Sequence, residues 1–168
     1  APFLANKKAV MQGYLSSEPV AIEMAAGFKP KVFLLADHGF DTYSTTIETR
    51  TELVEKKPET VRKFVEGSIL GWYNYLYGDN AAANVMIKKD NPEMTDASIA
   101  AGIRLMKEYG IVDSGDALQL GVGAMTDARM KSFFDKMVKA GLYKPTLDHR
   151  KSYTLAFVNK GLGRELRR

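Results

Sequence analysis

The spacing of apolar residues changes about fifty residues into the chain. Before that point, apolar residues form short continuous runs, for example over residues 32–36, and glycine, serine and proline bound these runs. Runs of this kind are typical of strands buried on both faces. We therefore expect strands at 9–15 and 31–36, with a helix from Val20 to Ala26 between them. A third extended segment is expected over 43–48, where β-branched and aromatic residues dominate.

From Thr51 onward, the apolar residues recur every three or four positions, which is the period of amphipathic helices. Pro58 fits the first turn of a long helix, Thr95 or Asp96 begins another, and Thr126 or Asp127 caps a third that ends at Gly141. A short helix is also expected from Asn80 to Lys88. The apolar stripe predicted for the long helix consists of Val61, Phe64, Val65, Ser68, Ile69, Trp72 and Leu76.

This order of elements predicts an α/β fold with few strands near the N-terminus followed by mostly helices. Sheets usually contain about four to six strands, and the chain offers only two or three. We therefore expect the 168 residues to form part of a larger architecture.

Composition narrows the function classes. Lys and Arg number 24 against 20 Asp and Glu, and the two signs are interleaved, so we expect no nucleic-acid partner. The absence of cysteine excludes disulfides, thiolate zinc sites and cysteine nucleophiles. The apolar runs are far shorter than the roughly 20 residues of a membrane-spanning helix. No segment has the pattern of a signal peptide.

The most chemically distinctive stretch is residues 13–19, where a predicted strand leads into the first turn of a helix. Tyr14 supplies a flat aromatic ring, Ser16 a hydroxyl and Glu18 an acceptor, and Gly13 permits close backbone approach. These groups suit a planar solute that forms hydrogen bonds. The alternatives are structural: Tyr14 as a core aromatic, Ser16 and Ser17 as helix caps, and Glu18 as a favourable charge at a helix N-terminus.

Other residues carry weaker signals. His38 and His149 lie far apart in sequence without a nearby acidic cluster, so we interpret them as solvated loop histidines. Gly121 and Gly123 lack the preceding strand of a dinucleotide site. We therefore expect no catalytic residue, no metal and no cofactor.

Three stretches, residues 9–23, 32–76 and 121–145, resemble the later half of periplasmic solute-binding proteins of ABC importers. The relevant group takes up thiamine pyrimidine precursors, nitrate, taurine and alkanesulfonates. The resemblance extends from about Lys8 to Gly163, and the order and spacing of the segments agree.

The resemblance implies a partial type II periplasmic binding protein fold, in which two α/β lobes close on a ligand in the cleft between them. Residues 1–40 would then end the second lobe and begin the hinge return, and residues 41–168 would form the mostly helical C-terminal part of the first lobe. Asp41, Tyr43 and Ser44 would border the cleft, although ordinary turn chemistry is the alternative. The first half of such a protein and its signal peptide would precede Ala1, which makes this chain a fragment.

The implied function is the substrate-binding component of an ABC importer, periplasmic and without enzymatic activity. Its expected partners are a small polar or aromatic solute, the membrane permease, and either the missing N-terminal half or a second copy of the chain. Two alternatives remain. One is an enzyme of the same fold that makes the thiamine pyrimidine from pyridoxal phosphate and a protein-bound histidine; such enzymes carry a cysteine-rich motif, which this chain lacks. The other is a helical interaction module without a ligand.

Overall fold

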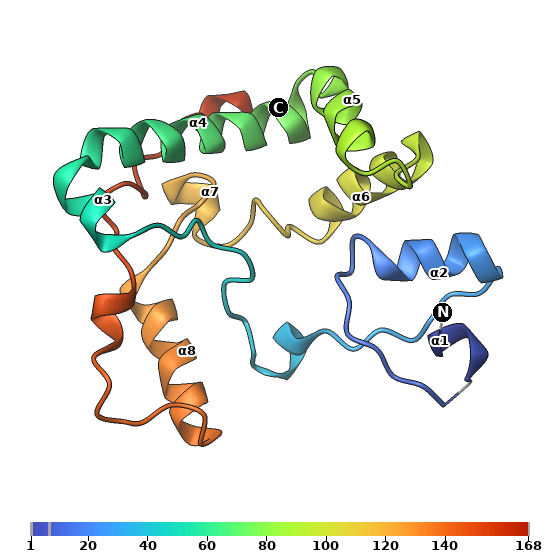
Figure 1. Ribbon diagram of the computed structural model, residues 1–168, viewed down its shortest axis with the longest axis horizontal. Coiled ribbons are helices and arrows are strands. Elements are labelled where there is room, and N and C mark those ends of the chain that lie inside the picture. Colours follow the sequence, from blue (N-terminus) through green and yellow to red (C-terminus); the bar gives the residue numbers. More distant parts are fainter. Residues whose placement is uncertain (1, 7, 168) are drawn as a thin grey trace. The chain divides into compact units, whose positions relative to one another are not determined.

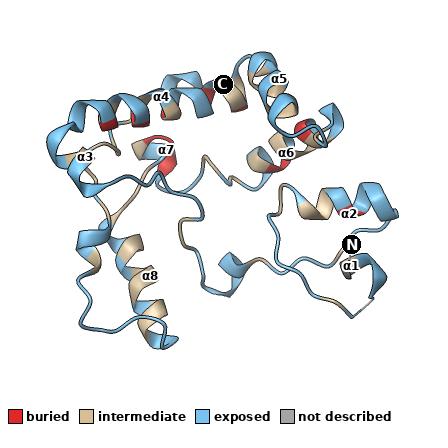
Figure 2. Ribbon diagram, in the orientation of Figure 1, coloured by how far each residue is buried: buried red, intermediate tan, exposed pale blue. Residues whose placement is uncertain are grey.

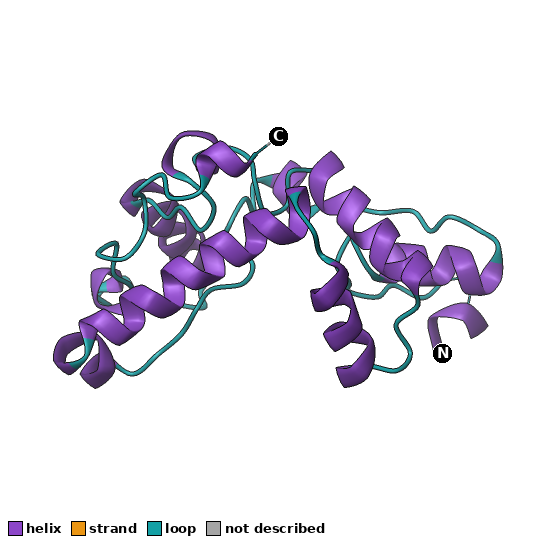
Figure 3. Cartoon of the chain, turned by 90° about the horizontal axis from the view of Figure 1, so that it is seen from above, coloured by secondary structure: helices purple, strands orange, loops and turns teal. Residues whose placement is uncertain are grey.

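The structure is a computed structural model that describes residues 2–6 and 8–167. All regular secondary structure in these residues is helical, and none of them forms a strand (Figure 3). The elements, labelled in Figure 1, are α1 (Pro2–Ala5), α2 (Glu18–Ala26), η1 (Leu35–His38), α3 (Thr51–Lys56), α4 (Pro58–Tyr77), α5 (Ala81–Asp90), α6 (Asp96–Glu108), α7 (Ala117–Leu120), α8 (Asp127–Lys139), η2 (His149–Ser152) and η3 (Arg164–Leu166).

The predicted α/β fold class is therefore wrong. Residues 9–14 and 29–34 form neither helix nor strand, residues 43–48 do not form the predicted extended strand, and residues 35–38 form the 3-10 helix η1. The physical reason is that a strand is completed by hydrogen bonds to a neighbouring strand, which an apolar run cannot supply by itself. Most side chains of these runs lie in solvent: Val10 is 95% exposed and Phe33 67%.

The predicted helices, by contrast, are confirmed, and so are the predicted caps of α6 and α8. The hydroxyl of Thr95 accepts a hydrogen bond from the Ser98 amide at 3.1 Å, which caps α6. The hydroxyl of Thr126 accepts one from the Arg129 amide at 3.3 Å, which caps α8. These side-chain caps satisfy amides that lack a partner within the helix. Local sequence signals therefore place the helix starts well.

The chain divides into two compact units. Unit 1 consists of residues 1–33 and 79–112, and unit 2 of residues 34–78 and 113–168. Each unit combines an early and a late part of the sequence, so contacts between distant residues hold each unit together. The lobe boundaries inferred from the resemblance concern a whole two-lobe protein and remain a proposal.

The core of unit 2 lies along one face of α4 (Figure 2). The predicted stripe is right at Val61, Val65, Ile69 and Leu76, which are buried. It is wrong at two aromatic positions, because Phe64 is 63% exposed and Trp72 40%. The buried face instead advances in steps of four residues to Tyr73, which is fully buried. Steps of four keep residues on a narrow stripe of the helix, and Trp72 lies beside it.

Two loops of unit 2 are tied to α4 by polar contacts. The Tyr73 hydroxyl accepts a hydrogen bond from the Val122 amide at 3.1 Å. The Tyr77 hydroxyl donates to Asp113 at 2.8 Å, and Arg167 Nε donates to the same carboxylate at 2.6 Å. The Asp113 side chain is almost completely buried, so these donors compensate its charge. The C-terminal residues thereby contribute to the core of unit 2.

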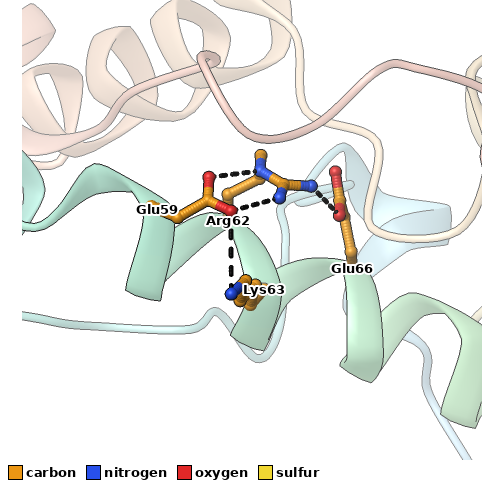
Figure 4. Close-up of polar contacts among 4 residues, drawn as sticks. All are labelled: Glu59, Arg62, Lys63 and Glu66. Atoms are coloured by element: carbon orange, nitrogen blue, oxygen red, sulfur yellow. Dashed lines mark hydrogen bonds and ion pairs between the residues drawn. The ribbon is translucent and has the colours of Figure 1, made fainter.

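The exposed side of α4 carries a charged cluster (Figure 4). Arg62 forms ion pairs with both Glu59 and Glu66, and Lys63 lies 3.9 Å from Glu59. Ion pairs on a solvated helix surface contribute little to stability, because water screens the charges. The cluster supports the helix without deciding the fold.

Unit 1 is held by packing of α2 against α6. Ile22 of α2 and Ile99 and Leu105 of α6 are its buried apolar side chains among the described residues. The backbone of α6 approaches closely here, since a Cβ at Gly102 would lie 3.4 Å from the Ser16 carbonyl oxygen. This contact lies in the segment that precedes α2, which contains three of the predicted site residues, Gly13, Tyr14 and Ser16; the fourth, Glu18, is the first residue of α2.

Candidate functional site

The first candidate segment, residues 13–18, forms a tight turn that leads into α2. The Ser17 amide donates to the Tyr14 carbonyl at 2.9 Å, which closes the turn. Glu18 reaches back across it, and its Oε2 accepts a hydrogen bond from the Tyr14 amide at 2.6 Å. Gly13 lies directly against the Glu18 side chain, because an added Cβ would be 2.9 Å from its Cβ, Cγ and Oε2. Any side chain at position 13 would therefore force the Glu18 side chain to move.

This 13–18 turn exposes part of its chemistry to solvent. The Tyr14 side chain is 61% exposed, and Ser16 and Glu18 are half-buried. Ser17 occupies the N-cap position of α2 but makes no side-chain capping hydrogen bond, so its interpretation as a cap is wrong. The turn is closed by the Glu18 carboxylate and the backbone, and it leaves an aromatic ring available for a planar partner.

The second candidate segment comprises residues 41–44, which we call the 41–44 strap. It lies against α8, and Arg129 in the first turn of that helix makes most of its contacts. Arg129 Nε donates to the Asp41 carbonyl at 2.6 Å, and Nη2 donates to the Thr42 carbonyl at 3.4 Å. The guanidinium lies over the Tyr43 ring, 4.4 Å from its centroid. One side chain therefore contacts three consecutive residues of the strap.

Two further residues of α8 and its cap complete these contacts. The Tyr43 hydroxyl accepts a hydrogen bond from the Thr126 amide at 2.9 Å. Lys136 Nζ lies 2.6 Å from Asp41 Oδ1. The hydrogen bond from Lys136, with help from a backbone hydrogen bond and the charges of Lys136 and Arg129, lowers the pKa of Asp41. Ser44, the last residue of the strap, is exposed.

The structure thus brings the predicted residues together in two groups. Gly13, Tyr14 and Glu18 contact one another within unit 1, whereas Asp41 and Tyr43 share Arg129 within unit 2. Sequence reasoning missed the partners on α8. They lie more than eighty residues from the strap, and no periodicity or motif links positions at that separation.

Each unit also contains a hollow, and neither hollow is lined by a predicted site residue. The hollow of unit 1, about 490 Å³, lies at α5 and α6; Asn84 on its wall has a buried Oδ1 without a hydrogen-bond partner in the described residues. The hollow of unit 2, about 260 Å³, is mainly apolar, and Lys160 and Glu66 are its charged lining residues.

The histidines differ in their surroundings. His38 is exposed at the end of η1, as expected of a solvated residue. His149 is not simply solvated, because its ring stacks on Phe134 of α8 at 4.8 Å with an interplanar angle of 18°. Across residues 2–6 and 8–167, no three His, Asp or Glu side chains are grouped as metal ligands. No described helix is long and apolar enough to cross a membrane.

Comparison with known proteins supports the predicted relationship. Residues 2–83 match the family described as NMT1/THI5 like. A riboflavin-binding protein, RibY of Chloroflexus aurantiacus, is 26% identical over 163 residues, which cover 96% of this chain and 45% of the relative. The chain therefore spans less than half the length of that relative. No solved structure matches the chain. The resemblance to solute-binding proteins is confirmed.

Proposed function

From this family relationship we propose that the chain is part of the substrate-binding component of an ABC importer. The whole protein would capture a small polar or aromatic solute between two lobes in the periplasm and deliver it to the membrane permease. In this proposal, residues 1–40 belong to the second lobe and the hinge return, and residues 41–168 to the first lobe. The remainder of the binding surface would come from an N-terminal half or from a second copy of the chain.

One observation carries the proposal. The family match covers residues 2–83, and all seven candidate site residues lie within that range. Both candidate segments, the 13–18 turn and the 41–44 strap, are therefore part of the sequence that is shared with the family. We propose that each segment contributes ligand contacts in the whole protein.

The chemistry of the segments favours a planar solute. An exposed aromatic ring such as Tyr14 can stack on a flat heterocycle, and such pairs contribute about 0.5–1.5 kcal/mol beyond their buried area. Since the relative from Chloroflexus aurantiacus is named for riboflavin binding, riboflavin is the first solute to test. Pyrimidines, taurine, nitrate and alkanesulfonates follow from the wider family.

The proposed mechanism is closure of two lobes around the solute. A ligand shifts an open–closed equilibrium only as far as it binds the closed form more tightly than the open form. Solute contacts made from both sides would supply this difference, and the permease would recognise the closed form. Hinge closure around a ligand is common among periplasmic binding proteins.

We propose that the protein is not an enzyme. The chain contains no cysteine, whereas the related pyrimidine-precursor synthases carry a cysteine-rich motif. An absorbance band of bound pyridoxal phosphate in the purified protein would overturn this part of the proposal.

The test is calorimetric titration of the complete product of the gene that encodes this chain, with riboflavin and the other solutes in turn. We expect saturable binding of one solute. Tyr14→Leu should weaken that binding about fivefold because the stacking surface is lost. Tyr109→Leu is the matched control, because Tyr109 is another exposed tyrosine of unit 1 that no candidate segment contains. Absence of heat from every solute, or equal losses in the two variants, would contradict the proposal.

A further inference from the structure

The 41–44 strap has little structure of its own. Residues 40–50 form neither helix nor strand, so no secondary-structure ladder fixes their backbone. At the N-terminal side, the Phe40 amide donates to the Leu35 carbonyl at 2.9 Å. Beyond that point, contacts with α8 and its N-cap residue hold the strap, and Arg129 makes most of them.

Arginine is suited to this task. Its guanidinium is planar, carries several donors in a fixed arrangement and stacks on aromatic faces. Arg129 uses all three properties together: it donates to the carbonyls of Asp41 and Thr42 and covers one face of Tyr43. A lysine at the same position could donate to a carbonyl but could not span both carbonyls and the ring.

The contacts with α8 also decide which groups of the strap remain available to a solute. The Asp41 carboxylate is paired with Lys136, and the Tyr43 hydroxyl is bonded to the Thr126 amide. Arg129 occupies one face of the Tyr43 ring. Among the uncharged side chains of the strap, Ser44 is exposed and Tyr43 is half-buried. A hydroxyl and an aromatic ring both suit a flat solute with hydrogen-bonding edges.

We propose that Arg129 is the positioning residue of the candidate site: it fixes the 41–44 strap on α8 so that the strap presents an uncharged surface to a planar, neutral part of the solute. This inference rests on the proposed function for the presence of a solute. The contacts of Thr126, Arg129 and Lys136 with the strap, which we call the clamp, do not rest on it, because they lie within unit 2 alone. The two ideas can therefore fail separately.

The experiment compares Arg129→Met with Arg129→Lys and with the control Lys131→Met. Lys131 lies on the same helix and pairs with Asp135 at 2.6 Å, away from the strap contacts. Exchange of the Thr126 amide, which is bonded to the Tyr43 hydroxyl of the strap, is measured without ligand by NMR. We expect Arg129→Met to accelerate exchange about tenfold, Arg129→Lys to give an intermediate rate, and Lys131→Met to match the unmodified chain. Unchanged exchange in Arg129→Met would overturn the proposal.

A second measurement distinguishes positioning from general stability. In the complete protein, we expect Arg129→Met to weaken riboflavin binding about tenfold and Arg129→Lys to restore part of it. Combined with Ser44→Ala, its effect should be smaller than the product of the single effects, because both changes act through the same strap. Fully independent effects, or an unchanged affinity despite faster exchange, would overturn the positioning role. If the unmodified protein binds none of the solutes, the proposed function fails, and the exchange rates alone decide whether the clamp exists.

Discussion

Two apolar regions of the chain differ in burial: one is buried and the other is exposed to solvent. One face of α4 in unit 2 carries apolar residues about every four positions. The residues on this face are buried: Val61, Val65, Ile69, Tyr73 and Leu76. The runs in unit 1 are more continuously apolar, yet Val10 and Phe33 are largely exposed. A helix satisfies its own backbone and needs cover on one face only, whereas an extended run needs neighbours along both edges and both faces. Hydrophobicity alone therefore did not secure burial.

The largest expected difference in stability is between truncating a side chain of the buried α4 face and truncating one of an exposed apolar run. Tyr73→Ala should lower the free energy of unfolding of unit 2 by about 3–5 kcal/mol, because it empties a fully buried position. Phe33→Ala should change stability by less than about 0.5 kcal/mol, because its side chain already lies in solvent. Urea denaturation followed by the fluorescence of Trp72, the single tryptophan, measures the first loss, and circular dichroism measures both. Similar losses in the two variants would break the comparison.

The glycine that packs on Tyr73 sharpens the same comparison. Gly163 has φ +75°, and an added Cβ would lie 2.8 Å from Tyr73 Cδ2. Gly141 has nearly the same backbone, φ +73°, but open space around it. We expect Gly141→Ala to cost about 1 kcal/mol and Gly163→Ala about 3 kcal/mol, because only the second adds a clash to the backbone strain. Equal thermal unfolding of the two variants would show that Tyr73 is not tightly packed.

The third prediction concerns the buried Asp113 carboxylate of unit 2 and its ion pair with Arg167. Tyr77 and Arg167 both donate to the Asp113 carboxylate, and Arg167→Met removes the charged donor of the two. We expect a loss of about 2 kcal/mol, below the usual cost of breaking a buried pair because Arg167 is partly exposed. The double variant Asp113→Asn with Arg167→Met should recover part of the loss in denaturant titrations. A double variant that is less stable than either single one would argue against a paired charge.

The smallest effect concerns pH at the strap. Lys136 lowers the pKa of Asp41, so the contact stabilises the folded chain above the ordinary carboxylate range and is lost as pH falls through the lowered pKa. Lys136→Met should move the pKa of Asp41 back toward 3.8. A carbon-detected NMR titration of the side-chain carboxyl measures this change. An unchanged midpoint would mean that the ion pair does not persist in solution.

The sequence predicted the helical part of the fold because its signals are local. Thr95 and Thr126 cap the helices to which they were assigned, and four of the seven stripe positions of α4 are buried. The prediction failed where burial depends on distant partners. The buried aromatic residue at this part of α4 is Tyr73 and not Trp72. The runs at 9–15 and 31–36 form no strand, and no described segment pairs with them as one.

The candidate site follows the same division. The contact between Gly13 and Glu18 lies within one turn, and its residues could be chosen from local pattern. The clamp on the strap joins Asp41 to Arg129 and Lys136, and only the folded chain reveals these partners. The charge of Asp41 could not be recognised as already paired, because nothing near it in sequence indicates Lys136.

The most direct test of the account is amide hydrogen exchange of the complete protein with and without saturating riboflavin. If the 13–18 turn and the 41–44 strap contact the solute, peptides covering both segments will exchange more slowly with ligand, while peptides from the middle of α6 will not change. Protection confined to other parts of the chain, with both segments unaffected by a bound solute, would contradict the account.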